Sequence, residues 1–533
     1  MQKLMLLGDE AIALGAIDSG LSGIYAYPGT PSTEITEFVK SSKEAREKNI
    51  KACWSTNEKT AMEAAIGMSY AGKRTMVCMK HVGLNVAADP FINSSITGAN
   101  GGMIVVSADD PSMHSSQNEQ DSRFYGKFAM IPVLEPTNQQ ECYNMVSYAF
   151  DLSEKFSVPV MMRLTTRLAH SRAGVVREKP RNQNTGKLPE NLRQYVLLPA
   201  MARKKYRKLI DQQNDFREAS SNSPFNKFYD GKDKSLGIIT SGIAYNYLME
   251  NYRDKELSFP VLKVSQYPLP GTSIRKMTSE CKELLILEDG YPMIEESLRG
   301  FLDNGIKIKG RMDGTLQFDG ELNPGKVAAA LGFPYPAGRD VPKVVTARPP
   351  ALCAGCPHID SYLALNTALE KYSKGRVFSD IGCYTLGALK PFESINSCVD
   401  MGASITMAKG AADAGLTPAV AVIGDSTFTH SGMTGLLDCV KDKANVTIII
   451  LDNSTTAMTG GQPSPGEGRL ADIVKGIGVE EEHIRIIKPL RKNHDENFKI
   501  IEEELNYNGV SVIIPTRECI VQTNKRMREK FKN

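Results

Sequence analysis

The chain has 533 residues, with 64 Lys and Arg against 61 Asp and Glu, and a formal charge of +3. This near-balance argues against a nucleic-acid-binding surface. A composition of 41% hydrophobic and 23% charged residues is typical of a globular protein of three or four domains and excludes a disordered or fibrous chain.

No apolar run approaches the roughly 20 residues that a membrane-spanning helix needs. The N-terminal sequence MQKLMLLGDEAIALG has no small-residue cleavage site of the secretory kind. Ten cysteines are too few for a disulfide scaffold in a chain of this length. We therefore expect a cytoplasmic protein that neither enters a membrane nor binds nucleic acid.

Residues 1–172 alternate short β-rich runs with helical patterns, which predicts a parallel α/β sheet. The strand-like runs are 23–27, 74–80, 103–108 and 158–164. Residues 58–70 carry apolar side chains at helical spacing and stop before Gly72. Glu58 is therefore expected in the first turn of a helix.

Residues 173–234 are rich in basic clusters and amides and have no strand pattern, so we expect a surface linker. Residues 235–350 look like a smaller doubly wound domain, and residues 351–533 resume the α/β alternation. The predicted fold class is α/β, with three doubly wound parallel-sheet domains. The later strand-like runs are 236–242, 260–265, 283–290, 377–382, 419–425, 445–453 and 510–516.

Polar residues follow two neighbouring strands of the last domain. Gly424 and Asp425 end one run and Asn453 ends the next. Ligands bind at the carboxyl edge of open α/β sheets. Asp425, Asn453 and the backbone carbonyl of Thr455 offer the oxygen ligands that Mg²⁺ prefers. An Asp at a strand end can also simply cap the next helix.

Cys353 and Cys356 form a Cys-x-x-Cys pair, with Cys383 and Cys519 further along the chain. Four thiolates could hold one [4Fe–4S] cluster. The close pair alone could instead be a zinc half-site or a redox dithiol.

Several motifs resemble the thiamine diphosphate-dependent 2-oxoacid:ferredoxin oxidoreductases, and most of all the large subunits of the indolepyruvate branch. They occur in family order and cover nearly the whole chain. Ser426 replaces the last glycine of the general Gly-Asp-Gly signature, as is usual in this branch. The motifs are YPGTPSTEI (27–35), STNEKTAMEAAIGMSYAGKR (55–74), MKHVGLNVAADP (79–90), RPPALCAGCPH (348–358), VIGDSTFTHSG (422–432) and LDNSTTAMTGGQPSPG (451–466).

The resemblance implies roles for individual residues. Glu58 would hydrogen-bond the thiamine aminopyrimidine, although a Glu in a first helical turn can also just offset the helix dipole. Thr30 would lie beside the substrate carbonyl, although Thr-Pro also reads as an N-cap followed by proline at the first helical position. Four further side chains near the same sheet edge are weaker substrate candidates that can also be surface hydrogen-bonding groups: His81, Asn85, His114 and Arg123.

The resemblance also implies the reaction: oxidative decarboxylation of an aryl pyruvate, transfer of the acyl group to coenzyme A and of electrons to ferredoxin or a similar carrier. The cofactors would be thiamine diphosphate, Mg²⁺ and one [4Fe–4S] cluster. We expect a smaller β subunit and a dimer of this chain as partners, and no C-terminal ferredoxin-like domain, because no cysteine follows Cys519. A non-oxidative decarboxylase and a catalytically silent scaffold are the alternatives.

Overall fold

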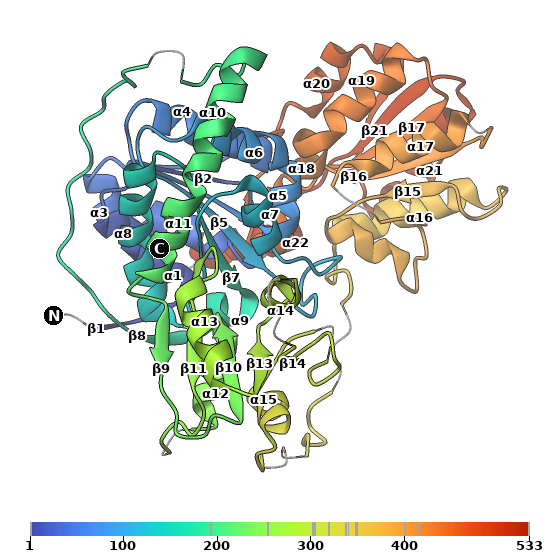
Figure 1. The fold of residues 1–533 in the computed structure, drawn as a ribbon. Coiled ribbons are helices and arrows are strands. Elements are labelled where there is room, and N and C mark those ends of the chain that lie inside the picture. The colour runs from blue at the N-terminus through green and yellow to red at the C-terminus, as the bar shows by residue number, and fades with distance from the viewer. Residues whose placement is uncertain are drawn as a thin grey trace. The chain divides into compact units, whose positions relative to one another are not determined.

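A computed structural model describes residues 3–191, 194–252, 255–300, 305–317, 320–335, 338, 340–346, 350–398, 401–413 and 415–530. Arg348 and Pro349 of the RPPALCAGCPH motif lie outside these ranges. The chain divides into two compact units, Met1–Arg339 and Asp340–Asn533, and each is described by itself (Figure 1). Among the described residues, no helix is long and apolar enough to cross a membrane.

A seven-stranded sheet forms the centre of the first unit. Its strands are parallel except for β12, which pairs antiparallel with β6. In sheet order the strands are β12 (Gln266–Tyr267), β6 (Val133–Leu134), β7 (Val160–Thr165), β5 (Met103–Asp109), β4 (Thr75–Lys80), β2 (Gly23–Ala26) and β3 (Lys51–Trp54).

Side chains of this sheet alternate between two hydrophobic layers, as the two-residue period of a strand requires. On β5, Ile104 and Val106 pack in one layer with α1 (Gly8–Asp18) and α8 (Gln139–Phe156). Met103 and Val105 pack in the other layer, with α4 (Glu58–Tyr70) and α6 (Ala88–Thr97). Helices therefore cover both faces. The remaining helices of this part are α2 (Thr33–Ser41), α3 (Lys43–Glu47), α5 (His81–Val86), α7 (Arg123–Ala129) and α9 (Thr166–His170).

A five-stranded sheet completes the first unit, in the order β14 (Lys307–Lys309), β13 (Glu283–Leu287), β10 (Leu236–Ser241), β11 (Val261–Val264) and β9 (Lys227–Tyr229). Its strands are parallel except for β9. Strand β12 belongs to the same stretch of chain as this sheet but pairs with β6 in the seven-stranded sheet. Buried residues of the two sheets pack together in one hydrophobic core. The accompanying helices are α12 (Ile243–Glu250), α13 (Gly271–Glu280), α14 (Met293–Arg299) and α15 (Pro324–Leu331).

The segment 173–234 differs from the strand-free linker expected from its sequence. It begins within β8 (Arg172–Val176), which pairs antiparallel with β1 (Lys3–Leu7), and ends with β9. Between them are α10 (Pro199–Asp211) and α11 (Gln213–Ser221), whose Leu209 and Phe216 are buried. Most basic side chains of α10 are exposed, and their number in the sequence obscures the short apolar stripe of this helix. The division into four segments at 172, 234 and 350 stays a prediction.

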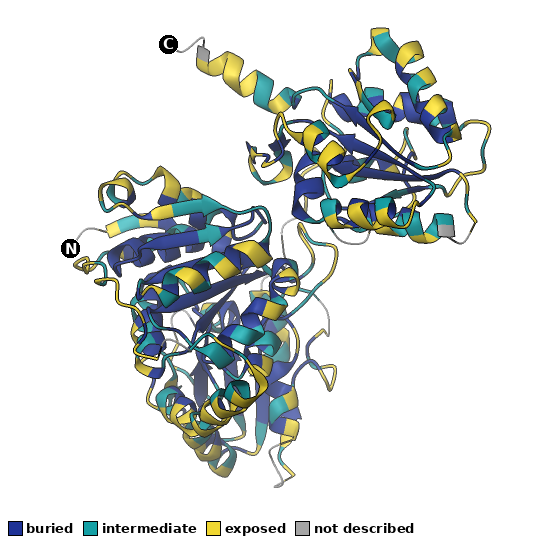
Figure 2. Ribbon diagram, turned by 90° about the horizontal axis from the view of Figure 1, so that it is seen from above, coloured by how far each residue is buried: buried dark blue, intermediate teal, exposed yellow. Residues whose placement is uncertain are grey.

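The second unit is built on one parallel sheet with the order β15 (Val377–Ser379), β16 (Ala419–Gly424), β17 (Val446–Leu451), β21 (Val510–Pro515) and β20 (Ile484–Ile487). Buried strands run between helices with exposed outer faces (Figure 2). The longer helices are α16 (Pro357–Leu369), α17 (Ala403–Asp413), α19 (Met433–Lys441), α20 (Leu470–Ile477), α21 (His494–Asn506) and α22 (Ile520–Lys530). The predicted α/β class with three mainly parallel sheets is confirmed, and each predicted strand run overlaps an observed strand.

Candidate active site

Loops from three neighbouring parallel strands meet at the carboxyl edge of the seven-stranded sheet. The loop after β2 carries Thr30, β4 ends at Lys80, and the loop after β5 carries Ser115. The Ser115 hydroxyl donates to the Thr30 carbonyl at 3.4 Å, and the Lys80 ammonium donates to the Ser115 carbonyl at 3.1 Å. These contacts bring Thr30 and Lys80 into one site.

Glu58 is the first residue of α4, as the sequence predicts. The Asn57 side chain caps the helix by accepting the backbone N–H of Thr60 at 2.8 Å, and this cap fixes where Glu58 begins the first turn. Glu58 is only 5% exposed. It packs against Gly83 of α5, where an added Cβ would lie 2.5 Å from the Glu58 Oε1 atom. The Glu58 carboxyl group is therefore buried at the start of α4 and packs against a backbone position that has no side chain.

The predicted helix start at Thr30-Pro31 is wrong. Ser32 precedes the helix, and α2 begins at Thr33. The Ser32 backbone N–H donates to the Gly29 carbonyl at 2.9 Å, so residues 29–32 form a turn before the helix. Thr30 therefore lies in a loop, partly exposed, rather than in a capping position.

His81 and Asn85 lie on α5, directly after β4. The His81 ring is 1% exposed; its Nε2 lies 3.1 Å from the Asn118 carbonyl, and its Nδ1 is buried without a hydrogen-bond partner among the described residues. Asn85 accepts a hydrogen bond from the Tyr125 hydroxyl at 2.7 Å. His114 is exposed and lies 3.3 Å from the Glu321 carboxylate.

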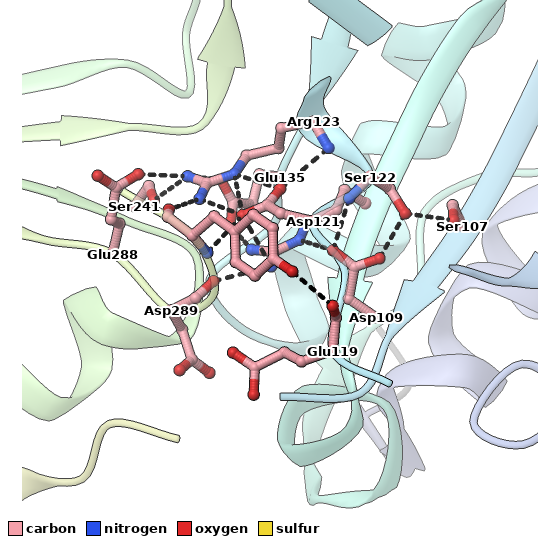
Figure 3. A network of polar contacts seen from close by, with 12 residues as sticks. Ser107, Asp109, Glu119, Asp121, Ser122, Arg123, Glu135, Ser241, Glu288 and Asp289 are labelled. Atoms are coloured by element: carbon pink, nitrogen blue, oxygen red, sulfur yellow. Dashed lines mark hydrogen bonds and ion pairs between the residues drawn. The ribbon is translucent and has the colours of Figure 1, made fainter. Parts of the chain in front are cut away.

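Arg123 lies in a buried ionic network rather than in the loop cluster at the sheet edge (Figure 3). Its guanidinium lies 2.9 Å from Glu288 and also pairs with Asp121. Arg163, on β7, donates to Asp109 of β5 at 2.7 Å and to the Asp289 carbonyl at 2.8 Å. The network joins the two sheets of the first unit. Because Arg123 is buried and forms ion pairs with carboxylates of its own chain, it is not available to bind a substrate carboxylate.

Burial and charge act in opposite directions within this network. Burial raises the pKa of Glu288 to about 7, although Arg123 opposes the rise. Burial would also raise the pKa of Asp121, but Arg123 and Arg163 hold it at about 2. Asp121 therefore remains a carboxylate and keeps both guanidinium groups charged and in place.

In the second unit, Asp425 and Asn453 emerge after the parallel strands β16 and β17, as predicted. Asp425 is 2% exposed, and its Oδ2 has no hydrogen-bond partner among the described residues. Burial, followed by repulsion from Asp452, raises the Asp425 pKa to about 7. A buried carboxylate oxygen without a partner is costly unless something binds it, and a cation beside it would offset that cost.

Further oxygen atoms that could bind a metal ion lie on the segments next to Asp425. The Asn453 Oδ1 accepts the Thr455 backbone N–H at 3.2 Å, and the Ser426 hydroxyl lies 2.9 Å from the Thr456 hydroxyl. A Cβ on Gly424 would lie 2.6 Å from the Tyr384 ring, so glycine is required for this close approach. The carboxylate, amide and hydroxyl oxygens fit the hard ligands that Mg²⁺ prefers.

Two buried polar residues near this edge were not singled out from the sequence. His358, in the first turn of α16, lies with its Nε2 3.3 Å from the Asn453 Nδ2, and burial lowers its pKa to about 4. Neutral His358 can therefore accept from Asn453. Asp380 accepts from the Ser404 hydroxyl, and burial raises its pKa to about 6. His358 belongs to the RPPALCAGCPH motif, but a lone histidine on a helix carries no signal of its own.

The four cysteines lie on segments that contact one another in the second unit. Arg517 donates to the Gly355 carbonyl at 3.3 Å, which joins the Cys353–Cys356 loop to the segment before Cys519. The Tyr362 hydroxyl donates to the Tyr384 carbonyl at 2.6 Å, which joins α16 to the residue after Cys383. Burial, followed by the charges of Cys356, Cys519 and Cys353, raises the Cys383 pKa to about 12. Clustered thiols of this kind need a bound metal to exist as thiolates.

Comparisons with known proteins identify the family of the chain. Residues 14–219 match the family described as pyruvate flavodoxin/ferredoxin oxidoreductase, thiamine diphosphate-binding, and residues 380–513 match the C-terminal thiamine pyrophosphate-binding domain of thiamine pyrophosphate enzymes. The chain is 39% identical to the indolepyruvate oxidoreductase subunit IorA of Archaeoglobus fulgidus, over all of this chain and 89% of that one. It is 37% identical to the IorA subunit of Pyrococcus horikoshii, over all of this chain and 88% of that one.

A solved structure of a 2-oxoglutarate:ferredoxin oxidoreductase from Magnetococcus marinus superimposes with a TM-score of 0.53 at 18% identity, over 62% of this chain and 65% of that one, and supports the fold. The full-length match to the IorA subunits is much stronger. The chain belongs to the family of indolepyruvate oxidoreductase IorA subunits, which are thiamine diphosphate-dependent enzymes of the 2-oxoacid:ferredoxin oxidoreductase class.

Proposed function

We propose that the chain oxidatively decarboxylates aryl pyruvates of the indolepyruvate type. One 2-oxoacid and one coenzyme A would give one aryl-acetyl-CoA, one CO₂ and one proton, while two electrons reduce two one-electron ferredoxins. The observation that carries this proposal is the placement of four cysteines on contacting segments at the sheet edge from which Asp425 and Asn453 emerge. A simple decarboxylase has no use for such a group of thiols.

Glu58 and Thr30 would supply the groups of the first unit that act on the cofactor and substrate. When bound, thiamine diphosphate supplies a nucleophilic carbon and stabilises the negative charge left by CO₂. The buried Glu58 carboxyl group would hold a proton at a ring nitrogen of the aminopyrimidine, and its fixed position at the start of α4 would keep that hydrogen bond in place. The Thr30 hydroxyl would donate to the substrate carbonyl oxygen.

The second unit would hold the diphosphate and its metal ion. Asp425, Asn453 and Thr455 would bind Mg²⁺ through oxygen atoms, and Gly424 and Ser426 would line the diphosphate. The partnerless Asp425 Oδ2 supports this assignment, because a divalent cation would favour the carboxylate that burial disfavours.

Cys353, Cys356, Cys383 and Cys519 would hold one [4Fe–4S] cluster. The relatives' designation as a subunit implies at least one partner subunit. We propose that this partner is the smaller β subunit, that the chain forms a dimer, and that ferredoxin or a similar carrier takes the electrons. His81 and Asn85 remain candidates for substrate contacts.

Product analysis under anaerobic conditions tests the proposal. The chain, purified with its smaller subunit, would be supplied with thiamine diphosphate, Mg²⁺, coenzyme A, phenylpyruvate or indolepyruvate, and oxidised ferredoxin. We expect aryl-acetyl-CoA and reduced ferredoxin in a ratio of about 1:2, as two-electron oxidation requires. Aryl acetaldehyde as the main product, independent of coenzyme A, would instead establish the non-oxidative decarboxylase.

A further inference from the structure

Lys80 lies among the residues proposed to act on the substrate, although the sequence does not single it out. It ends β4, and its side chain crosses to the loops that carry Thr30 and Ser115. A Cβ on Gly29 would lie 3.4 Å from the Lys80 Cγ and Cδ atoms, so the lysine stem runs along the Thr30 turn. The side chain is partly buried.

The charge of Lys80 is only partly compensated by its surroundings. Its ammonium donates to the Ser115 carbonyl at 3.1 Å, and among the described residues no carboxylate oxygen lies within 4.0 Å of it. Burial lowers the Lys80 pKa, while Asp110 and Glu58 act in the opposite direction from further away. Asp110 is itself occupied by the Ser115 backbone N–H at 2.8 Å and the Ser116 hydroxyl at 2.7 Å. The ammonium keeps donors for a bound anion.

Four other cationic side chains of the first unit are paired with carboxylates. Arg123 and Arg163 are held in the buried network. Arg167 pairs with Glu321 at 2.8 Å, and His170 lies 3.5 Å from Glu34. Among these groups and Lys80, the lysine is the one that contacts the Thr30 and Ser115 loops without a carboxylate partner.

We infer that Lys80 binds the carboxylate of the 2-oxoacid and positions its carbonyl beside Thr30. This assignment rests on the proposed function. It makes Lys80 the residue through which the site prefers a 2-oxoacid to an uncharged analogue. A charge-assisted hydrogen bond in a partly buried site contributes more than a neutral one. A lysine ammonium can also release the carboxylate as CO₂ forms, because it makes single, rotatable contacts rather than a rigid two-point grip.

Binding of an acid and of its uncharged amide tests this inference without turnover. The complex, loaded with thiamine diphosphate and Mg²⁺, would carry Glu58→Gln so that the substrate is not consumed. Calorimetry would then measure the affinity for phenylpyruvate and for phenylpyruvamide. Lys80→Met would be compared with Lys59→Met, which removes an exposed lysine of α4 paired with Glu63. Lys80→Gln would serve as a second neutral variant if Lys80→Met unfolds.

We expect the Glu58→Gln parent and the Lys59→Met variant to bind the acid about 10- to 100-fold more tightly than the amide. Neutralising Lys80 should remove this preference and leave amide binding and thiamine diphosphate binding unchanged. An acid preference that survives in both Lys80 variants would overturn the assignment while leaving the proposed function intact. A parent that binds neither compound would overturn both.

Discussion

The backbone N–H of Cys519 donates a hydrogen bond of 3.2 Å to the carbonyl of Asn453. This contact joins a proposed cluster ligand to a proposed magnesium ligand through two neighbouring strands, β17 and β21. Asn453 is also 3.3 Å from His358, which follows the Cys353–Cys356 loop by two residues. The proposed magnesium-binding segment and the cysteine-bearing segments of the second unit are therefore joined by hydrogen bonds.

Replacing Glu58 by Gln should lower kcat by about 10²- to 10⁴-fold, because the variant can no longer exchange a proton with the aminopyrimidine. The affinity for thiamine diphosphate should change little, since the amide keeps the shape of the side chain. Steady-state rates and cofactor titration measure the two effects. Glu63→Gln, an exposed position on the same helix, is the control and should be fully active. Full activity in Glu58→Gln would contradict the assigned role.

Asp425 should make the stability of the metal-free chain depend on pH. Its carboxyl group titrates near pH 4 when unfolded and at about 7 when folded. The stability that its protonated form contributes is therefore fully present below about pH 4 and is lost as the pH rises through about 7. Asp425→Asn has no such charge, so the metal-free variant should exceed wild type at pH 8 by on the order of 2–4 kcal/mol and show little difference at pH 4.

Magnesium should reverse this difference in stability between wild type and Asp425→Asn at pH 8. Mg²⁺ with thiamine diphosphate should raise the melting temperature of wild type at pH 8 and leave that of Asp425→Asn unchanged, because binding requires the carboxylate. Asp438→Asn, at an exposed position on α19, should respond like wild type. Equal stabilisation of Asp425→Asn by the cofactor would show that Asp425 is not a ligand.

Replacing Cys356 or Cys383 by Ser should remove iron from the purified protein, since a [4Fe–4S] cluster needs four ligands. Iron and acid-labile sulfide analysis of anaerobically purified chain measures the loss. Cys398→Ser alters an exposed cysteine of the same unit and should keep its iron. Iron that persists in every Ser variant of the four cysteines would place the cluster elsewhere or on the partner subunit.

Replacing Arg123 by Met should destabilise the first unit by about 3–5 kcal/mol, because Glu288 would be left buried without its cation and Asp121 would keep only Arg163. Chemical denaturation measures this change. Arg167→Met removes an exposed ion pair with Glu321 and should cost at most about 1 kcal/mol. Arg123→Lys should retain the KM for the aryl pyruvate while losing stability. If Arg123→Lys kept full stability and showed a large rise in KM, Arg123 would have to contact the substrate.

The sequence predicted the elements whose patterns are local. The helical spacing of apolar residues over 58–70 placed Glu58 correctly in a first turn, and the strand-like runs placed Asp425 and Asn453 at strand ends. The role of Arg123 could not be predicted, because its partners Glu288 and Tyr267 are distant from it in sequence, and Glu288 follows β13 of the five-stranded sheet. Lys80 gave no signal, because a lysine at a strand end is normally solvated and only the Thr30 and Ser115 loops bury it.

We propose that electrons pass from the substrate to a cluster held by this chain. The most direct test is an anaerobic electron paramagnetic resonance spectrum of the chain with its smaller subunit, thiamine diphosphate and Mg²⁺, before and after phenylpyruvate and coenzyme A are added. The proposed electron transfer predicts a reduced [4Fe–4S] signal that appears only with substrate and disappears in Glu58→Gln and in Cys383→Ser. No iron signal in the wild-type complex, with aryl acetaldehyde accumulating, would contradict it.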